Sequence, residues 1–162
     1  MALSTTQSIW RSGGGDQTRT AYCGSGLMAA NFYFSATQAS GNALNASGGV
    51  PVILPAGAVI VEIQANAAGT GGTDPTFDMG YTLYSTGTVT ADGLLNESDA
   101  DAGKQVFNWA SATAGTGLGG VMSATEMVYI TGRKGASAAT GGNVSGTILY
   151  FVTDPLIGQQ NV

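Results

Sequence analysis

The sequence contains no histidine and only one cysteine, Cys23, among its 162 residues. Without histidine, the chain cannot form a Ser-His-Asp triad, a Cys-His pair or a histidine metal site. A single cysteine excludes an intrachain disulfide and a thiolate zinc site, and Cys23 is expected to be a small buried hydrophobe. Carboxylates are then the main candidates for general acids and bases, and we predict that the chain is not an enzyme.

Charge is also scarce, because charged residues make up 9% of the chain, against about 25% in typical domains. Five Lys and Arg stand against ten Asp and Glu, which gives a net charge of −5. Nucleic acids and anionic membranes both attract clustered basic side chains, and only Arg133 and Lys134 are adjacent. We therefore predict no nucleic-acid partner and no membrane partner.

Long hydrophobic runs are missing as well. No apolar segment approaches the roughly 18 residues of a membrane span, and residues 1–15 lack the apolar centre of a secretory signal. We expect synthesis in a cytoplasm without signal cleavage, after which the protein could leave the cell as part of a particle.

Alternating apolar and polar residues predict β-strands in two segments, 54–66 and 76–85. In the first segment, one face is expected to carry Val59, Val61, Ile63 and Ala65, and the other Ile60, Glu62, Gln64 and Asn66. In the second, Phe77, Met79, Tyr81 and Leu83 share a face. Pro55 and Gly57 indicate the turn before the first strand, and a glycine cluster begins at Gly69.

Shorter patterns predict the remaining strands, at 28–36, 50–54, 104–110, 125–132 and 144–153. The acidic segment 91–103 is expected to contain one helical turn with Asn96 or Ser98 as its N-cap. Seven or eight short strands without a long helix predict an all-β fold, an antiparallel β-sandwich or jelly-roll-like domain. We assign residues 21–155 to this domain, 1–20 to an extended N-terminal arm and 156–162 to a C-terminal tail.

The last predicted strand is apolar on both faces. Ile148, Tyr150 and Val152 lie on one face, and Leu149 and Phe151 lie on the other. Since a small sandwich normally exposes one face of each sheet to water, the second face needs a cover. We expect another copy of the chain to supply it in a homo-oligomer, a homotrimer in the simplest case, with Leu149 and Phe151 at the interface.

The polar arm contains a short anchor-like group, Ile9, Trp10 and Arg11. Because the arm has too few apolar residues to fold alone, we expect it to become ordered against a partner. Other aromatic residues, Tyr33, Tyr84, Trp109 and Tyr129, lie at strand spacing and are expected in the core. A stacking platform for sugars or bases is the alternative for them.

Two local patterns resemble ligand sites but fail on their spacing. Glu97, Asp99 and Asp101 suggest a calcium loop, yet Ala102 and Asn108 occupy the positions that require Gly and Glu. We interpret the loop as a solvated acidic segment and leave calcium binding open. The glycines of 115–120 match a dinucleotide fingerprint, but no helix is expected after them, so we interpret the segment as a mobile loop.

The order of these features resembles a recurrent domain of tailed-bacteriophage virion proteins. The shared features are the LPAGA turn and its strand, Asp78-Met79-Gly80, the acidic segment from Asp92-Gly93 to Asp101, and the closing run from Ser145 to Tyr150. The resemblance spans residues 50–153. It implies a small β-sandwich, often trimeric, that decorates phage heads or forms the tips of fibres and spikes, with neither enzyme activity nor a cofactor.

Because the chain shows no heptads or repeats for a stem, we favour a capsid decoration (cement) protein on the outer surface of the virion head. Its partners would be the major capsid protein and further copies of itself. The alternative is a receptor- or glycan-binding module of a tail fibre or spike, using loops 37–49, 111–120 and 133–143. A glycoside hydrolase that uses Asp92, Asp99 or Asp101 is the least favoured hypothesis.

Overall fold

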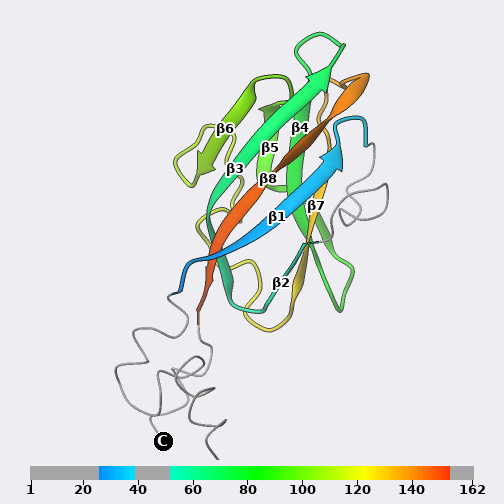
Figure 1. Ribbon diagram of the computed structural model, residues 1–162. Coiled ribbons are helices and arrows are strands. Elements are labelled where there is room, and N and C mark those ends of the chain that lie inside the picture. The colour runs from blue at the N-terminus through cyan, green and yellow to red at the C-terminus, as the bar shows by residue number, and fades with distance from the viewer. Residues whose placement is uncertain (1–25, 39–51, 154–162) are drawn as a thin grey trace, which may run out of the picture.

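The computed structural model describes residues 26–38 and 52–153, which form eight strands and, within these ranges, no helix (Figure 1). The strands are β1 (Met28–Ser35), β2 (Ile53–Leu54), β3 (Ala58–Thr70), β4 (Thr76–Leu83), β5 (Val89–Asp99), β6 (Gly103–Asn108), β7 (Val128–Lys134) and β8 (Gly141–Val152). The described part of the chain therefore contains no helix that could span a membrane. The arm, the tail and most of loop 37–49 lie outside the described residues.

The strands form two four-stranded sheets, in the orders β1-β8-β3-β6 and β2-β7-β4-β5. All the paired strands are antiparallel. The first and last strands are neighbours, and consecutive strands alternate between the sheets over most of the chain. This arrangement confirms the predicted all-β, antiparallel β-sandwich.

The core lies between the two sheets and is lined by side chains from both. Four phenylalanines form a chain of ring contacts across it: Phe32–Phe34, Phe34–Phe77 and Phe77–Phe107, with centroids 6.2, 6.0 and 6.3 Å apart. Each buried Phe contributes about 1.5–3 kcal/mol through burial. The predicted inward face of β4 is confirmed for Phe77 and Met79, which are fully buried.

A β-bulge changes the predicted faces of β3. The register with β8 shifts between Ile60 and Glu62, so that Ile60 is fully buried and Val61 is only partly buried. The strict alternation expected for Val61 and Ile60 is therefore wrong at this point, because one extra residue reverses the side-chain direction. Beyond the bulge, Ile63 and Ala65 are buried as predicted.

The acidic segment 91–103 has no helical turn, and its first part belongs to β5. On one side, Asp99 and Ser98 of β5 pair with Thr76 and Phe77 of β4. On the other side, the N–H of Asn96 donates to the carbonyl of Thr113 at 2.9 Å. The prediction of an N-cap at Asn96 or Ser98 is wrong because backbone pairing on both sides outweighs the local preference of polar residues for caps.

The glycine-rich segment 111–120 is held by the sheets instead of forming the mobile loop that was expected. The N–H groups of Gly115, Gly117 and Gly119 donate to the carbonyls of Leu94, Gly93 and Ile60 at 2.7–2.8 Å. A Cβ on Gly115 would lie 2.4 Å from the backbone of Gly93. The glycines therefore allow a close approach of two backbones. The predicted loop 133–143 is also shorter, because β7 ends at Lys134 and β8 begins at Gly141.

Gly146 offers a direct test of this close packing. A Cβ at this position would lie 1.9 Å from the backbone oxygen of Gln64 and 2.9 Å from the ring of Phe32. We expect Gly146→Ala to lower the free energy of unfolding by about 1–3 kcal/mol or more, because backbone cannot move aside cheaply. Urea denaturation measures this change. Gly26→Ala is the control, because a Cβ there meets nothing within 4 Å; equal losses in both variants would contradict the packing.

Candidate interaction surfaces

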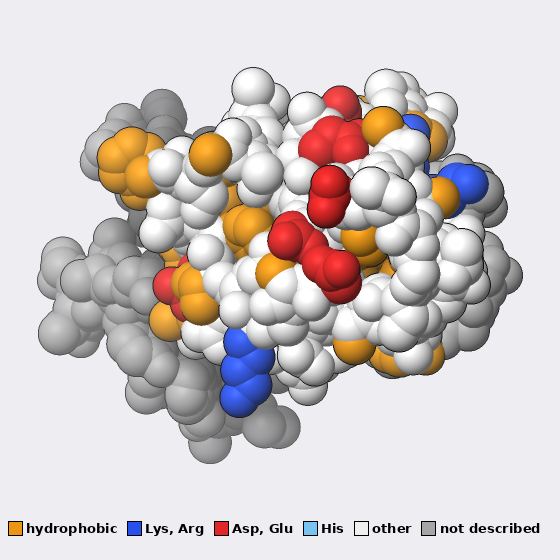
Figure 2. Space-filling view, turned by 90° about the horizontal axis from the view of Figure 1, so that it is seen from above, with side chains coloured by type: hydrophobic (Ala, Val, Ile, Leu, Met, Phe, Trp, Pro, Cys, Tyr) orange, Lys and Arg blue, Asp and Glu red, His pale blue; other side chains and the backbone are white. Residues whose placement is uncertain are grey.

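The two ends of the sandwich differ in chemistry. At one end, the loops around Asp74, Glu97, Asp99 and Asp101 bring acidic side chains together, as Figure 2 shows from above. At the opposite end lie the start of β1, the end of β8 and the hairpin between β4 and β5 (Figure 1). Both terminal segments of the chain therefore leave the domain at the end away from the acidic loops.

Most of the large exposed hydrophobic side chains also lie toward this second end, which we call the apolar end. They are Leu27, Met28, Ile53, Tyr84, Val89, Val121 and Met127. Backbone pairing places Ile53 beside Tyr129, and Tyr129 beside Thr82, whose other neighbour is Val89. Ile53, Tyr129 and Val89 therefore lie in one row across the outer face of the β2-β7-β4-β5 sheet, with Thr82 between Tyr129 and Val89.

The rings of Tyr84 and Tyr129 contact each other beside this row, with centroids 5.5 Å apart and planes tilted by 31°. Tyr84 remains 54% exposed. Its expected burial in the core is therefore wrong, because it lies just beyond the end of β4 and on the outward side. We call Ile53, Tyr84, Val89, Met127 and Tyr129 the tyrosine patch.

Trp109 is also outside the core, with 75% of its surface exposed. β6 ends at Asn108, so Trp109 lies in the following turn, where its Cβ faces the close-packed backbone of Gly119. Tyr33 is partly buried on the outer face of β1, next to Ser145. The prediction that Tyr33, Tyr84 and Trp109 lie in the core is therefore wrong.

Leu149 and Phe151, the two predicted interface residues of the domain, are partly buried on the outer face of β8. Phe151 pairs with Val59, and Leu149 pairs with Ala29 and Glu62. Their inward neighbour Ile148 is fully buried in the core. The two side chains therefore belong to the outer face of the β1-β8-β3-β6 sheet near the apolar end. Ile9, Trp10 and Arg11 lie outside the described residues.

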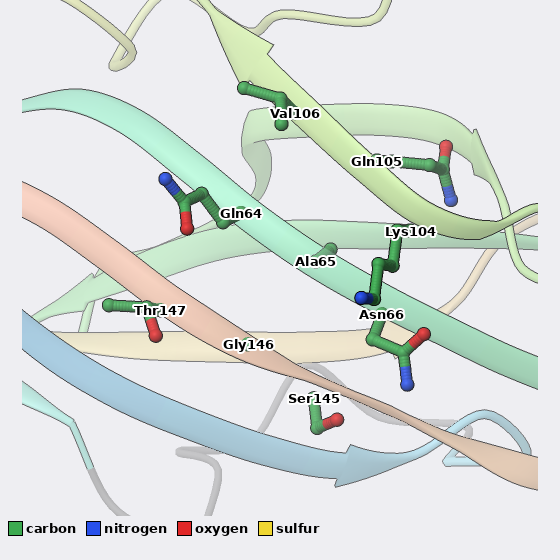
Figure 3. A pocket seen from close by; sticks show the side chains of 9 residues that line it. All are labelled: Gln64, Ala65, Asn66, Lys104, Gln105, Val106, Ser145, Gly146 and Thr147. Carbon is green, nitrogen blue, oxygen red and sulfur yellow. The ribbon is translucent and has the colours of Figure 1, made fainter.

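A shallow groove crosses the upper part of the same sheet face (Figure 3). Its walls carry amide, hydroxyl and amine groups from Gln64, Asn66, Lys104, Ser145 and Thr147. The hydroxyl of Thr147 donates to Oδ1 of Asn31 at 2.9 Å, and Nε2 of Gln64 donates to Oε1 of Glu62 at 2.7 Å. The groove offers hydrogen bonds with little net charge.

The acidic loop is organised by hydrogen bonds among its own residues. The N–H of Asp101 donates to the Asp99 carboxylate at 3.0 Å, and this bond and one to the Asp101 side chain lower the pKa of Asp99. The shared hydrogen bond with Asp99 raises the pKa of Asp101. Among the described residues, no group of three acidic or sulfur side chains could hold a metal ion.

Glu97 has a structural role beside this loop. Its carboxylate accepts hydrogen bonds from the N–H of Ala136, at 2.8 and 3.0 Å, and from the hydroxyl of Thr76. Its own N–H donates at 2.8 Å to Asp78, which is 2% exposed and forms a 2.8 Å ion pair with Arg133. These bonds account for the positive φ of Glu97, 51°, because they hold the backbone in place.

The tyrosine patch and the groove were not predicted from the sequence. Alternation assigns Tyr129 to one face of its strand, but the packing of the two sheets decides which face of the strand is buried. The polar face of β3, with Gln64 and Asn66, was predicted, and this was the available signal for the groove. Its other wall comes from β6 and β8, which are far away in sequence.

No protein-family model matches the chain, and no curated protein matches its sequence. Among solved structures, the chain is similar to one described as the cyanophage Pam1 capsid asymmetric unit, with 18% identity and a TM-score of 0.42. The match covers 80% of this chain and 88% of that chain. Similarity at this level establishes no function for the chain.

Glu126 supports the hairpin that carries Tyr84, and its contribution should depend on pH. Hydrogen bonds from Ser85, including one of 2.6 Å from its N–H, lower the pKa of Glu126. A lowered pKa in the folded state means that the carboxylate stabilises the fold above its unfolded-state pKa, and that this stabilisation is lost as the pH falls through the folded-state value.

We therefore expect Glu126→Gln to lower the free energy of unfolding at neutral pH. The difference from the unmodified protein should shrink below about pH 4.3, the ordinary glutamate value, and vanish at lower pH. Urea denaturation at a series of pH values measures this difference. A difference that stays constant across the series would contradict a charge-dependent bond to Ser85.

Proposed function

We propose that the chain is a bacteriophage structural protein that decorates the outer surface of the capsid, with the major capsid protein as its partner. The protein would be made in the host cytoplasm and become part of the virion there. The role requires neither catalysis nor a cofactor, and the described carboxylates Asp78, Glu97 and Glu126 serve in structural hydrogen bonds.

The observation that carries this proposal is the division of the sandwich into an apolar end and an acidic end. A protein that covers a shell needs one side suited to contact and one suited to water. The apolar end has exposed hydrophobic side chains together with the start of β1 and the end of β8, while the acidic end collects like charges that favour hydration. We place the apolar end toward the shell.

The resemblance to virion domains points in the same direction. Its features now have structural positions: the LPAGA turn leads into β3, Asp78 lies in β4 and anchors Glu97, and the closing run forms half of β8. All three lie within the one sandwich, and the resemblance covers its strands from β2 to β8 but not β1.

We further propose a homotrimer in which the outer faces around Leu149 and Phe151 meet. These side chains are partly buried in the single chain, next to Val59 and Ala29. Their association would remove the remaining apolar surface from water. A ring of three copies would also present three arms to the shell together, which increases the apparent affinity by about 10²–10⁴.

A receptor- or glycan-binding tail module is the second candidate, and the groove of Figure 3 favours it. Its amide and hydroxyl groups suit a neutral, hydroxyl-rich ligand. Binding to host surface glycans without binding to phage heads would support this second function over decoration.

The arm should attach the protein to the shell through Trp10. Truncation of a buried interface Trp often costs about 2 kcal/mol or more, so we expect Trp10→Ala to weaken binding and deletion of residues 1–16 to abolish it. The measurement is co-pelleting with undecorated phage heads. Circular dichroism and the oligomer mass serve as controls for folding. Full coating by the truncated protein would show that the arm is not the anchor.

The trimer should depend on Phe151. We expect Phe151→Asp to produce monomers or aggregates, because a buried unpaired carboxylate at the interface is costly. Light scattering after gel filtration measures the mass. Val106→Asp is the matched control, since Val106 is an exposed apolar residue on the same sheet but away from this site. A stable monomer of the unmodified protein would contradict the proposal.

A further inference from the structure

β1 presents a long, regular strand edge. Its eight residues pair with β8 without a bulge, from Met28 with Tyr150 to Ser35 with Asn143. The strand, MAANFYFS, contains no charged residue and no proline. Within residues 26–38 and 52–153, no strand pairs with its other edge. Such an edge readily accepts another strand.

The other edges of the two sheets carry features that discourage pairing. β2 has two residues, and β6 is short and carries Lys104. β5 has two register shifts, and the N–H groups of Gly115 and Gly117 bond to its outer edge. Short length, lysine, irregularity and covering loops are the usual protections of sheet edges. Within residues 26–38 and 52–153, the edge of β1 has none of these features, so it is suited to contact with a partner strand.

We propose that the outer edge of β1 is a strand-acceptor site that residues 17–23 of a neighbouring copy occupy in the assembled oligomer. The segment QTRTAYC alternates β-favouring Thr and Tyr with other residues and contains no Gly or Pro. Once added, its Arg19 would supply the charge that protects the new edge and that β1 lacks. Gly13, Gly14 and Gly15 would separate this strand from the Trp10 anchor.

The direction of the chain favours a neighbouring copy as the donor. The described residues before β1 approach it from the side where β8 ends, and not from its outer edge (Figure 1). A strand of seven residues extends about 23 Å, which matches most of β1. In a closed ring, each copy would donate one segment and accept one. The inference rests on the proposed oligomer but not on binding to the shell.

Hydrogen exchange of the full-length protein tests this site. We compare the unmodified chain with Thr20→Pro, which removes a hydrogen-bond donor within the proposed strand. Thr6→Pro is the matched control, the same substitution in the part of the arm before the glycines. We expect alternate amides of β1 to be protected in the unmodified protein and in Thr6→Pro, and to lose protection in Thr20→Pro. Unchanged protection of β3 and β4 amides verifies the fold.

The mass of the oligomer shows whether the added strand comes from a neighbouring copy or from the same chain. Loss of β1 protection in Thr20→Pro together with a lower mass supports donation by a neighbour, and dilution of the unmodified oligomer should expose β1 in the same way. Loss of protection without a change in mass would assign the strand to the same chain and overturn the proposal. Protection retained in Thr20→Pro, or absent in the unmodified protein, would also overturn it. Failure to bind phage heads would affect only the proposed function.

Discussion

The position of β8 between β1 and β3 is the interaction on which the rest of the structure depends. β8 pairs with all eight residues of β1 on one side. On the other side it pairs with β3, from Ala58 opposite Val152 to Thr70 opposite Gly141. The last strand therefore joins the first to the centre of the sheet. Because both partners are antiparallel to it, the start of β1 and the end of β8 must lie at the same end of the domain.

Because of this constraint, the two ends of the sandwich differ. The start of β1 and the end of β8 lie at the apolar end, while the acidic side chains lie at the other end. Some of the few charged side chains bind other groups within the domain: Asp78 forms an ion pair with Arg133, and Glu97 accepts hydrogen bonds from the N–H of Ala136. On the face seen in Figure 2, backbone and uncharged polar side chains make up most of the described surface.

The candidate surfaces could be predicted only in part. Leu149 and Phe151 were assigned to an outer face from alternation alone, and the structure places them there. The tyrosine patch could not be predicted because Tyr84, which follows β4, and Tyr129 of β7 meet only through the pairing of these two strands. The groove likewise combines Gln64 with Lys104 and Thr147, and no local pattern relates the three.

The sequence by itself determined the fold class, since period-two alternation and frequent turn residues permit strands and little else. It also determined the inward faces of β1 and β4, because Phe32, Phe34, Phe77 and Met79 follow that period. Only the tertiary structure decided the bulge after Ile60, the strand conformation around Glu97 and the exposure of Trp109. Each of these depends on backbone pairing with segments far along the chain, and such pairing outweighs local preference because it satisfies many N–H and C=O groups at once.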